Sequence, residues 1–154
     1  MEKLLIIDGN SILNRAYYGI RPLTAPDGTP TNAVYGFLNI LFKHLEEEQP
    51  DYLAVAFDVK AKTFRHKMYE LYKAQRKPAP EDFLVQLPLI KEVLSAMGCA
   101  CIEQEGYEAD DLIGTVSSFC QEKGVACRIL TGDKDDLQLA SENTVIKLVI
   151  TRMG

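Results

Sequence analysis

Short runs of apolar residues alternate along the chain with longer stretches of helical periodicity. Most of the short runs are apolar on both faces, as strands buried in a parallel sheet are. They cover residues 4–7, 52–57, 99–102, 125–130 and 144–150. Strands that alternate with helices predict an α/β fold, in which a doubly wound, mostly parallel five-stranded sheet carries helices on both faces.

Three apolar stripes, with spacings of three and four residues, predict helices between these strands. The stripes run from Val34 to Leu45, from Phe83 to Met97 and from Leu112 to Cys120. Gly98 and Gly124 follow the second and third stripes, where glycine commonly ends a helix. Pro88 lies inside the second stripe and predicts a kink or a shifted start, because proline has no backbone N–H to donate.

The connection after the second predicted strand is about 24 residues long, a length that usually has a function. Between Lys60 and Lys77 seven Lys and Arg residues face one Glu, so this stretch carries +6 in a chain of net charge −5. Phe64, Tyr69 and Tyr72 are interleaved with the bases. Aromatic rings can stack on unpaired nucleobases while cations meet phosphates, which makes the segment a candidate for nucleic-acid binding. A solvated, charged helix is the alternative.

The composition excludes several classes of protein. A length of 154 residues is that of one domain, and 47% hydrophobic with 25% charged residues argues against disorder. No apolar run approaches the roughly 18 residues of a membrane span, and the N-terminus does not resemble a signal peptide, so we expect a cytoplasmic protein without a membrane partner. Without a CxxC pair, the cysteines are expected to be small buried hydrophobes in a reducing compartment. They are Cys99, Cys101, Cys120 and Cys127.

Acidic residues follow four of the five predicted strands. They are Asp8 after the first, Asp58 after the second, Glu108, Asp110 and Asp111 after the third, and Asp133 and Asp135 after the fourth. The carboxyl ends of parallel strands lie at one edge of the sheet, which is where ligands bind in such folds. Each acid taken alone could equally be a turn residue, a helix cap or a first-turn acid.

Carboxylates gathered at one edge favour a divalent metal. Two of them about 4 Å apart repel by roughly 4 kcal/mol at an effective dielectric constant of 20. Hard oxygen ligands, with no Cys or His nearby in sequence, favour Mg²⁺ or Mn²⁺, and two such ions can promote phosphodiester hydrolysis. No phosphate-binding loop of the GxxxxGK[ST] or GxGxxG type follows a strand, so we expect no nucleotide cofactor. Arg15 could reach a phosphate or form a surface ion pair.

Seven short motifs occur in order along nearly the whole chain. They are Leu5-Ile6-Ile7-Asp8-Gly9-Asn10, Ala33-Val34-Tyr35-Gly36-Phe37, Phe57-Asp58, Thr63-Phe64-Arg65, Tyr72-Lys73-Ala74-Gln75-Arg76, Gly106-Tyr107-Glu108-Ala109-Asp110-Asp111 and Thr131-Gly132-Asp133-Lys134-Asp135. With these motifs the chain resembles the 5′-nuclease domain at the N-terminus of bacterial DNA polymerase I. That domain belongs to the flap-endonuclease superfamily, which is related to PIN nucleases.

The resemblance implies a metal-dependent 5′-3′ exonuclease or flap endonuclease in replication and repair. Its substrate would be DNA with a 5′ flap, a nick or a 5′-ended duplex, and a polymerase would follow in the same chain. It implies Mg²⁺ or Mn²⁺, with two ions in the complete domain, and a cluster of metal-binding carboxylates formed by Asp8, Asp58, Glu108, Asp110, Asp111, Asp133 and Asp135. Lys73 and Arg76 would lie on a basic arch at about residues 60–80 and act in catalysis beside Asp8 and Asp58, while Arg15, Arg65 and Tyr72 would help to hold the DNA.

The chain departs from this family pattern at its C-terminal end. The family's domain continues with a helix–three-turn–helix module and two further aspartates, whereas this sequence ends at Gly154. We therefore expect a single 1–154 domain that is weakly active or inactive as a fragment. The alternatives are a PIN-type ribonuclease and a noncatalytic domain that binds metal and DNA. A phosphoacceptor domain also has acids at strand ends, but it gives no reason for the basic run.

Overall fold

The computed structural model describes residues 2–59, 80–141 and 144–149, and the side chains of residues 134–136 lie outside that description. Within it, five strands form one sheet in the order β3-β2-β1-β4-β5, and every neighbouring pair is parallel. The strands are β1 (Lys3–Asp8), β2 (Tyr52–Ala56), β3 (Ala100–Ile102), β4 (Ala126–Thr131) and β5 (Thr144–Leu148). The predicted α/β fold is confirmed.

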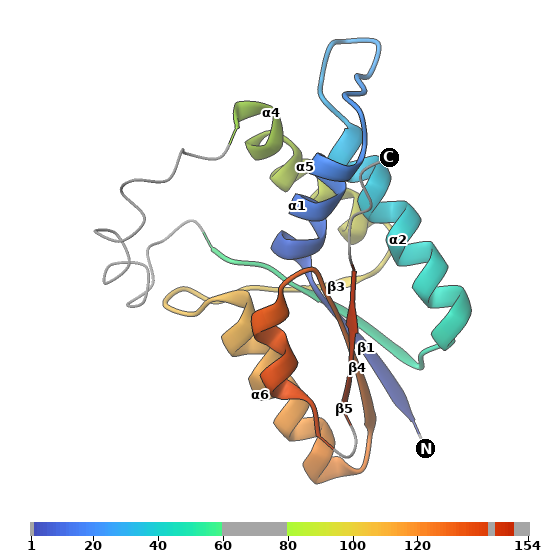
Figure 1. Cartoon of the computed structure of the whole chain (residues 1–154), viewed down its shortest axis with the longest axis vertical. Helices are drawn as coiled ribbons and strands as arrows, with labels where there is room; N and C mark the ends of the chain where they lie inside the picture. Colours follow the sequence, from blue (N-terminus) through green and yellow to red (C-terminus); the bar gives the residue numbers. More distant parts are fainter. Residues whose placement is uncertain (1, 60–79, 142–143, 150–154) are drawn as a thin grey trace.

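Helices cover both faces of this sheet (Figure 1). They are α1 (Gly9–Gly19), α2 (Asn32–Glu48), α4 (Glu81–Leu84), α5 (Gln86–Ala96), α6 (Ala109–Lys123) and the 3-10 helix η1 (Lys134–Leu139). In the central strand, Leu5 and Ile7 pack against α1, α2 and α5, while Ile6 between them packs against α6 on the opposite face. Burial of both faces of β1 is the reason for its uninterrupted apolar sequence.

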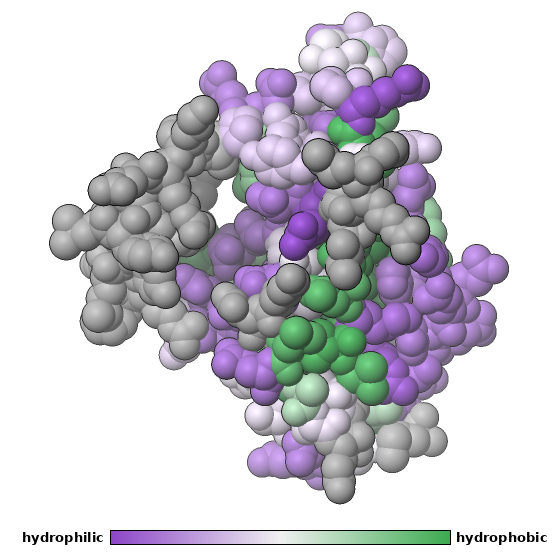
Figure 2. All heavy atoms as spheres, viewed as in Figure 1, coloured by the Kyte–Doolittle hydropathy of each residue, from purple (hydrophilic) through white to green (hydrophobic). Residues whose placement is uncertain are grey.

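The edge strands are less buried than the centre of the sheet. β3 is largely exposed, and β5 is half-buried along most of its length. Figure 2 shows hydrophobic side chains gathered over β5 and η1, where Val145 and Leu137 are exposed. The expectation of strands that are apolar and buried on both faces therefore holds for β1 and fails at the edges.

The helix signals in the sequence are mostly confirmed. α2 and α6 contain the predicted stripes, and Gly98 and Gly124 adopt φ values of +82° and +71° just beyond α5 and α6. Pro88 lies in the first turn of α5, where its missing N–H costs no intrahelical bond, and a separate short helix, α4, precedes it. α1 was not predicted, because it begins directly after a strand with Gly9 and Asn10, which are poor helix formers.

The prediction that all four cysteines are buried is wrong for two of them. Cys120 and Cys127 are buried between α6 and β4, but Cys101 is exposed and Cys99 is half-buried, because both lie at the edge strand β3. All four are free thiols. Burial raises the pKa of the Cys127 thiol to about 12, as does the neighbouring Cys120. Such a thiol stays protonated and serves as a small apolar group.

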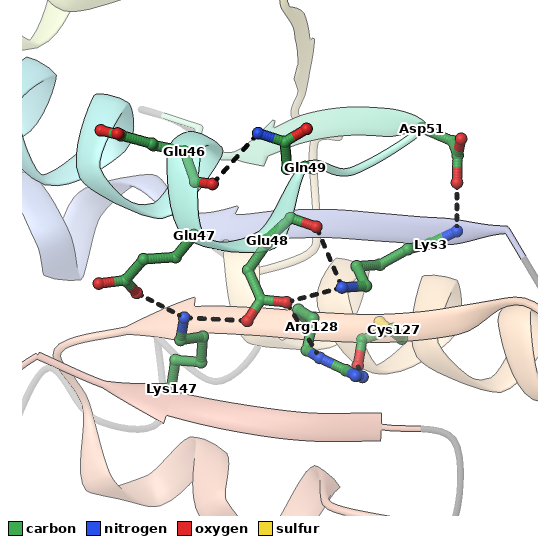
Figure 3. Close-up of polar contacts among 9 residues, drawn as sticks. All are labelled: Lys3, Glu46, Glu47, Glu48, Gln49, Asp51, Cys127, Arg128 and Lys147. Atoms are coloured by element: carbon green, nitrogen blue, oxygen red, sulfur yellow. Dashed lines mark hydrogen bonds and ion pairs between the residues drawn. The ribbon is translucent and has the colours of Figure 1, made fainter.

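A cluster of ion pairs ties the end of α2 to the sheet (Figure 3). The Glu48 carboxylate lies 3.1 Å from Lys3 Nζ, 3.3 Å from Arg128 Nε and 3.0 Å from Lys147 Nζ. Lys147 also contacts Glu47, at 3.1 Å. The three cations come from β1, β4 and β5, so a single carboxylate links three strands.

Two further expectations concern the basic arch and membrane-spanning helices. The basic arch at residues 60–80, with Arg65, Tyr72, Lys73 and Arg76, falls almost entirely outside the described residues. In the residues that are described, no helix is long and apolar enough to span a membrane.

Candidate active site

The sheet reverses its winding direction between β1 and β4. From β1 the chain proceeds through β2 to β3 on one side, and it then returns to β4 and β5 on the other. In open parallel sheets the crevice for ligands lies at this switch point, beyond the carboxyl ends of the strands. Asp8 is the last residue of β1, and Asp133 follows the end of β4 by two residues, so both stand at this point.

An open cavity of about 730 Å³ occupies the switch point. Three of the predicted acids line it, one from the end of each of three neighbouring strands. The lining residues are Asp8, Asn10, Ser11, Asn14, Arg15, Asp58, Gly132 and Asp133. The sheet thus brings together residues that are up to 125 positions apart in the sequence, as the parallel topology predicted.

Asp8 is held at the start of α1. Its side chain, in a residue only 6% exposed, accepts the Ser11 N–H at 3.4 Å and the Thr131 hydroxyl at 3.4 Å. The carboxylate therefore caps α1, whose N-terminal dipole favours a negative charge. Gly9 is required beside it, because a Cβ there would lie 2.5 Å from the Phe57 ring.

Asp58 joins the end of β2 to the start of α6. Its main-chain N–H donates to the Asn10 side-chain oxygen at 2.8 Å, and its carboxylate accepts the Ala109 N–H at 2.6 Å. The residue is exposed to solvent beside the cavity. Asn10 thus links the start of α1, just after β1, to the end of β2.

The three acids at the start of α6 have a different arrangement. Glu108 is the residue before the helix, and its N–H donates to the Asp111 carboxylate at 3.1 Å, which is the capping role that the sequence left open. Asp110 and Asp111 line a second, polar hollow of about 330 Å³ between α6 and η1. Of the predicted acids whose side chains are described, five therefore divide between two cavities, and Glu108 lines neither.

Arg15 supports the loop that follows β4. Its Nε and Nη2 atoms donate to the Gly132 carbonyl oxygen at 3.1 and 3.0 Å, and the side chain lines the acidic cavity. A Cβ at Gly132 would lie 2.5 Å from Arg15 Cγ, so the close approach needs glycine. The sequence did not suggest this contact with the loop, and the phosphate contact and surface ion pair that it suggested for Arg15 stay predictions.

Among the described residues, no three or more His, Cys, Asp or Glu side chains form a group that could hold a metal ion. The side chain of Asp135, which belongs to the predicted set, lies outside the description. The structure therefore brings Asp8, Asp58 and Asp133 to one cavity without assembling a complete set of protein ligands there.

Sequence reasoning missed Asn10, Ser11 and Thr131 as parts of the site. Ser11 and Thr131 join β1, α1 and the loop after β4 through hydroxyl hydrogen bonds. The sequence signal that could have identified Ser11 and Thr131 is that each lies within three residues of an acid at a strand end. That position became informative only once β1 and β4 were known to be neighbours.

Comparison with known proteins shows which family the chain belongs to. Residues 3–153 match the sequence model of the family described as 5′-3′ exonuclease, N-terminal resolvase-like domain. Over 150 residues the chain is 49% identical to DNA polymerase I of Caldicellulosiruptor bescii, covering 97% of this chain and 18% of that protein. Over 146 residues it is 46% identical to a 5′-3′ exonuclease of Aquifex aeolicus, covering 95% and 50%. The chain thus spans half or less of the length of these relatives.

A solved structure shares the fold. The chain superposes on a bacteriophage T5 flap endonuclease, solved as a complex with DNA and metal ions, with a TM-score of 0.68 at 16% sequence identity. The match covers 94% of this chain and 54% of the T5 chain. At so low an identity the likeness concerns the fold alone, and it agrees with the five-stranded parallel sheet described above.

Proposed function

Since this chain belongs to the family of 5′-3′ exonuclease N-terminal resolvase-like domains, we propose that it contributes the acidic site of a metal-dependent 5′ nuclease. The reaction is the hydrolysis of a DNA phosphodiester near a 5′ end or flap. The observation that carries the proposal is the cavity at the switch point, where Asp8, Asp58 and Asp133 converge from three strand ends.

The residues at this cavity fit Mg²⁺ or Mn²⁺ better than zinc. Their side chains offer carboxylate, amide and hydroxyl oxygens, which are the donors that hard cations prefer. Mg²⁺ also keeps several waters and commonly uses one or two carboxylates together with substrate phosphates. A cavity whose three carboxylates do not yet form a ready metal-binding group among the described residues is therefore compatible with Mg²⁺, whereas a zinc site requires three or four protein ligands.

We propose that Asp8, Asp58 and Asp133 hold the first ion, while Glu108, Asp110, Asp111 and Asp135 are the further acids of the set. The second ion expected in the complete domain would also need the two later aspartates of the family. Bound divalent ions would activate water and stabilise the leaving oxygen. The chain's own part is to fix the carboxylates: Asn10 holds the backbone of Asp58, and the hydroxyl of Thr131 holds both Asp8 and the backbone of Asp133. Arg15 places a positive charge at the wall of the same cavity.

The remaining proposed residues rest on the sequence motifs. Lys73 and Arg76, three residues apart, would present two cations to one phosphate as negative charge builds in the transition state. Tyr72 would stack on an unpaired base, and Arg65 would add general attraction for the DNA backbone.

The test is cleavage of a 5′-labelled flap DNA by this chain, with single-stranded RNA as the competing substrate. The assay is run with Mg²⁺, with Mn²⁺ and with a chelator, and the longer Aquifex relative serves as the positive control. We expect metal-dependent release of the flap, weaker than that by the longer protein. The Asp58→Asn variant should lose cleavage, while Asp27→Asn, on an exposed loop away from the cavity, should keep it.

Other outcomes select the alternatives. Cleavage of RNA with no cleavage of flap DNA would identify a PIN-type ribonuclease. Binding of metal and DNA with no cleavage under any condition, both by this chain and by one extended through the family's helix–three-turn–helix module, would identify a noncatalytic binding domain. Cleavage that is unaffected by the chelator would exclude the proposed mechanism.

A further inference from the structure

Two hydroxyl groups connect the acids of the cavity. The Ser11 and Thr131 hydroxyl oxygens lie 3.2 Å apart, across the boundary between the start of α1 and the end of β4. The Thr131 hydroxyl contacts the Asp8 carboxylate at 3.4 Å, and the Ser11 hydroxyl contacts the Asp8 main-chain carbonyl at 3.2 Å. Thr131 is fully buried, so its hydroxyl depends on these protein partners.

The directions of these hydrogen bonds follow from the donors available. The Gly132 N–H donates to the Ser11 hydroxyl at 3.0 Å, and the Asp133 N–H donates to the Thr131 hydroxyl at 3.0 Å. Each hydroxyl oxygen thus accepts a backbone N–H and has a single hydrogen left to give. The hydrogen of Thr131 goes to the carboxylate of Asp8, because a bond to an ionised acceptor is the stronger one. Ser11 is then the donor in its contact with Thr131, and its one hydrogen is shared between Thr131 Oγ1 and the Asp8 carbonyl oxygen.

We propose that Thr131, supported by Ser11, is a positioning residue that sets the Asp8 carboxylate and the Asp133 backbone relative to one another for binding a divalent ion. One hydroxyl group bonds to both partners, and their carboxylates line the same cavity. This inference rests on the proposed function. Outer-shell partners of this kind typically change metal affinity by about 10–100-fold when they are removed.

A second pair of hydroxyls supplies a matched control. Ser117 in α6 and Thr144 in β5 are also buried and lie 2.9 Å apart, but neither lines the acidic cavity. Loss of either threonine hydroxyl removes a buried hydrogen bond, and so both changes should lower the stability of the fold. Only the loss at Thr131 should change the binding of metal.

The experiment measures Mn²⁺ affinity by electron paramagnetic resonance, which reports the free ion, for the parent chain and for Thr131→Val, Thr131→Ser and Thr144→Val. We expect Thr131→Val to weaken Mn²⁺ binding by about 10–100-fold. Thr131→Ser, which keeps the hydroxyl, should stay within about threefold of the parent, and Thr144→Val should match the parent despite its lower melting temperature. If Thr131→Val does not fold, Ser11→Ala replaces it, with an expected loss of several-fold.

The outcomes separate this inference from the proposed function. A parent chain that binds Mn²⁺, with Thr131→Val or its replacement binding equally well, would overturn the positioning role and leave the nuclease proposal intact. Equal losses in Thr131→Val and Thr144→Val would show that the hydroxyl acts through general stability, which also overturns it. A parent chain that binds no Mn²⁺ would overturn both.

Discussion

Asp8 and Glu48 are both largely buried carboxylates, but their surroundings differ. The Glu48 side chain, 15% exposed, is surrounded by Lys3, Arg128 and Lys147 (Figure 3). Asp8 shares its cavity with two other carboxylates and accepts hydrogen bonds from a backbone N–H and a hydroxyl. The protein thus surrounds the Glu48 carboxylate with three cations, whereas it gathers Asp8 with two further carboxylates and Arg15 around one open cavity.

The difference separates stability from function. A carboxylate surrounded by cations stabilises the fold, because opposite charges and hydrogen bonds offset the cost of burying it. Carboxylates that line one cavity repel each other unless a cation is bound, and such sites commonly cost stability in the free protein. Removal of an acid should therefore harm function at one place and stability at the other.

The largest expected effect is that of Asp133→Asn. Because Asp133 is a proposed ligand of the ion, loss of its carboxylate should weaken Mn²⁺ binding and flap cleavage by about 100-fold or more. That is at least as much as the strongest changes to residues that only support a ligand. Because Asp133 is exposed, the unfolding free energy without metal should stay within about 0.5 kcal/mol of the parent or rise. Calorimetric titration with Mn²⁺ and urea unfolding measure the two quantities. A variant that binds metal normally but unfolds easily would reverse the assignment of this acid.

Metal itself should stabilise the fold through the same cavity. At a free Mn²⁺ concentration 100 times the dissociation constant, the unfolding free energy rises by about 2.7 kcal/mol. For a chain of this length that corresponds to a melting temperature higher by about 5–10 °C. The increase should disappear in Asp133→Asn and persist in Glu48→Gln. Equal increases in both variants would place the ion somewhere other than the cavity.

How far the sequence predicts this contrast depends on the range of the interactions. The acids of the cavity were predictable, because each directly follows an apolar run and parallel topology brings strand ends together. The hydroxyl of Thr131 was not, because its partners Asp8 and Ser11 are 120 or more positions away. The Glu48 cluster likewise needs the pairing of β1, β4 and β5, which local periodicity does not specify.

The fold shows the same limit. The stripes of α2 and α6 were sufficient to predict both helices, because their apolar residues recur with helical spacing. α1 is amphipathic but short, and the tertiary packing of Ile12 and Leu13 stabilises it. The start of α2 depends on Gln86, a fully buried side chain whose oxygen accepts the N–H groups of Ala33 and Val34 at 2.8 and 3.0 Å. A cap supplied by another helix has no local sequence signal.

The Glu48 side of the comparison is tested by Glu48→Gln. The change leaves two lysines and an arginine without their shared carboxylate, and the unfolding free energy should fall by about 1–3 kcal/mol. The matched control is Glu47→Gln, an exposed neighbour whose carboxylate pairs, among the described residues, only with Lys147 and should have a smaller effect. Urea unfolding at neutral pH measures both, and Mn²⁺ affinity should not change in either. A Glu47→Gln effect as large as that of Glu48→Gln would argue against the special role of the shared carboxylate.

The smallest expected effect is the pH dependence of the loss in unfolding free energy that Glu48→Gln causes. Burial alone would raise the pKa of Glu48, but hydrogen bonds from Lys147 and Lys3 lower it from 4.5 to about 2. The unfolded chain therefore takes up a proton at a higher pH than the folded chain, so this contribution to stability is complete above pH 4.5 and is lost as the pH falls toward 2.

The pKa of Lys147 shifts in the opposite sense. Burial would lower it, but its bonds to Glu48 and Glu47 raise it above 10.5, so its contribution is complete below pH 10.5 and is lost at higher pH. The difference in unfolding free energy between the parent and Glu48→Gln should therefore be constant from pH 5 to 10 and shrink toward pH 3. Urea unfolding of both proteins at pH 3, 5 and 7 measures it. An equal difference at pH 3 and pH 7 would mean that the variant loses packing rather than a charge, and Glu48 would then no longer contrast with the acids of the cavity.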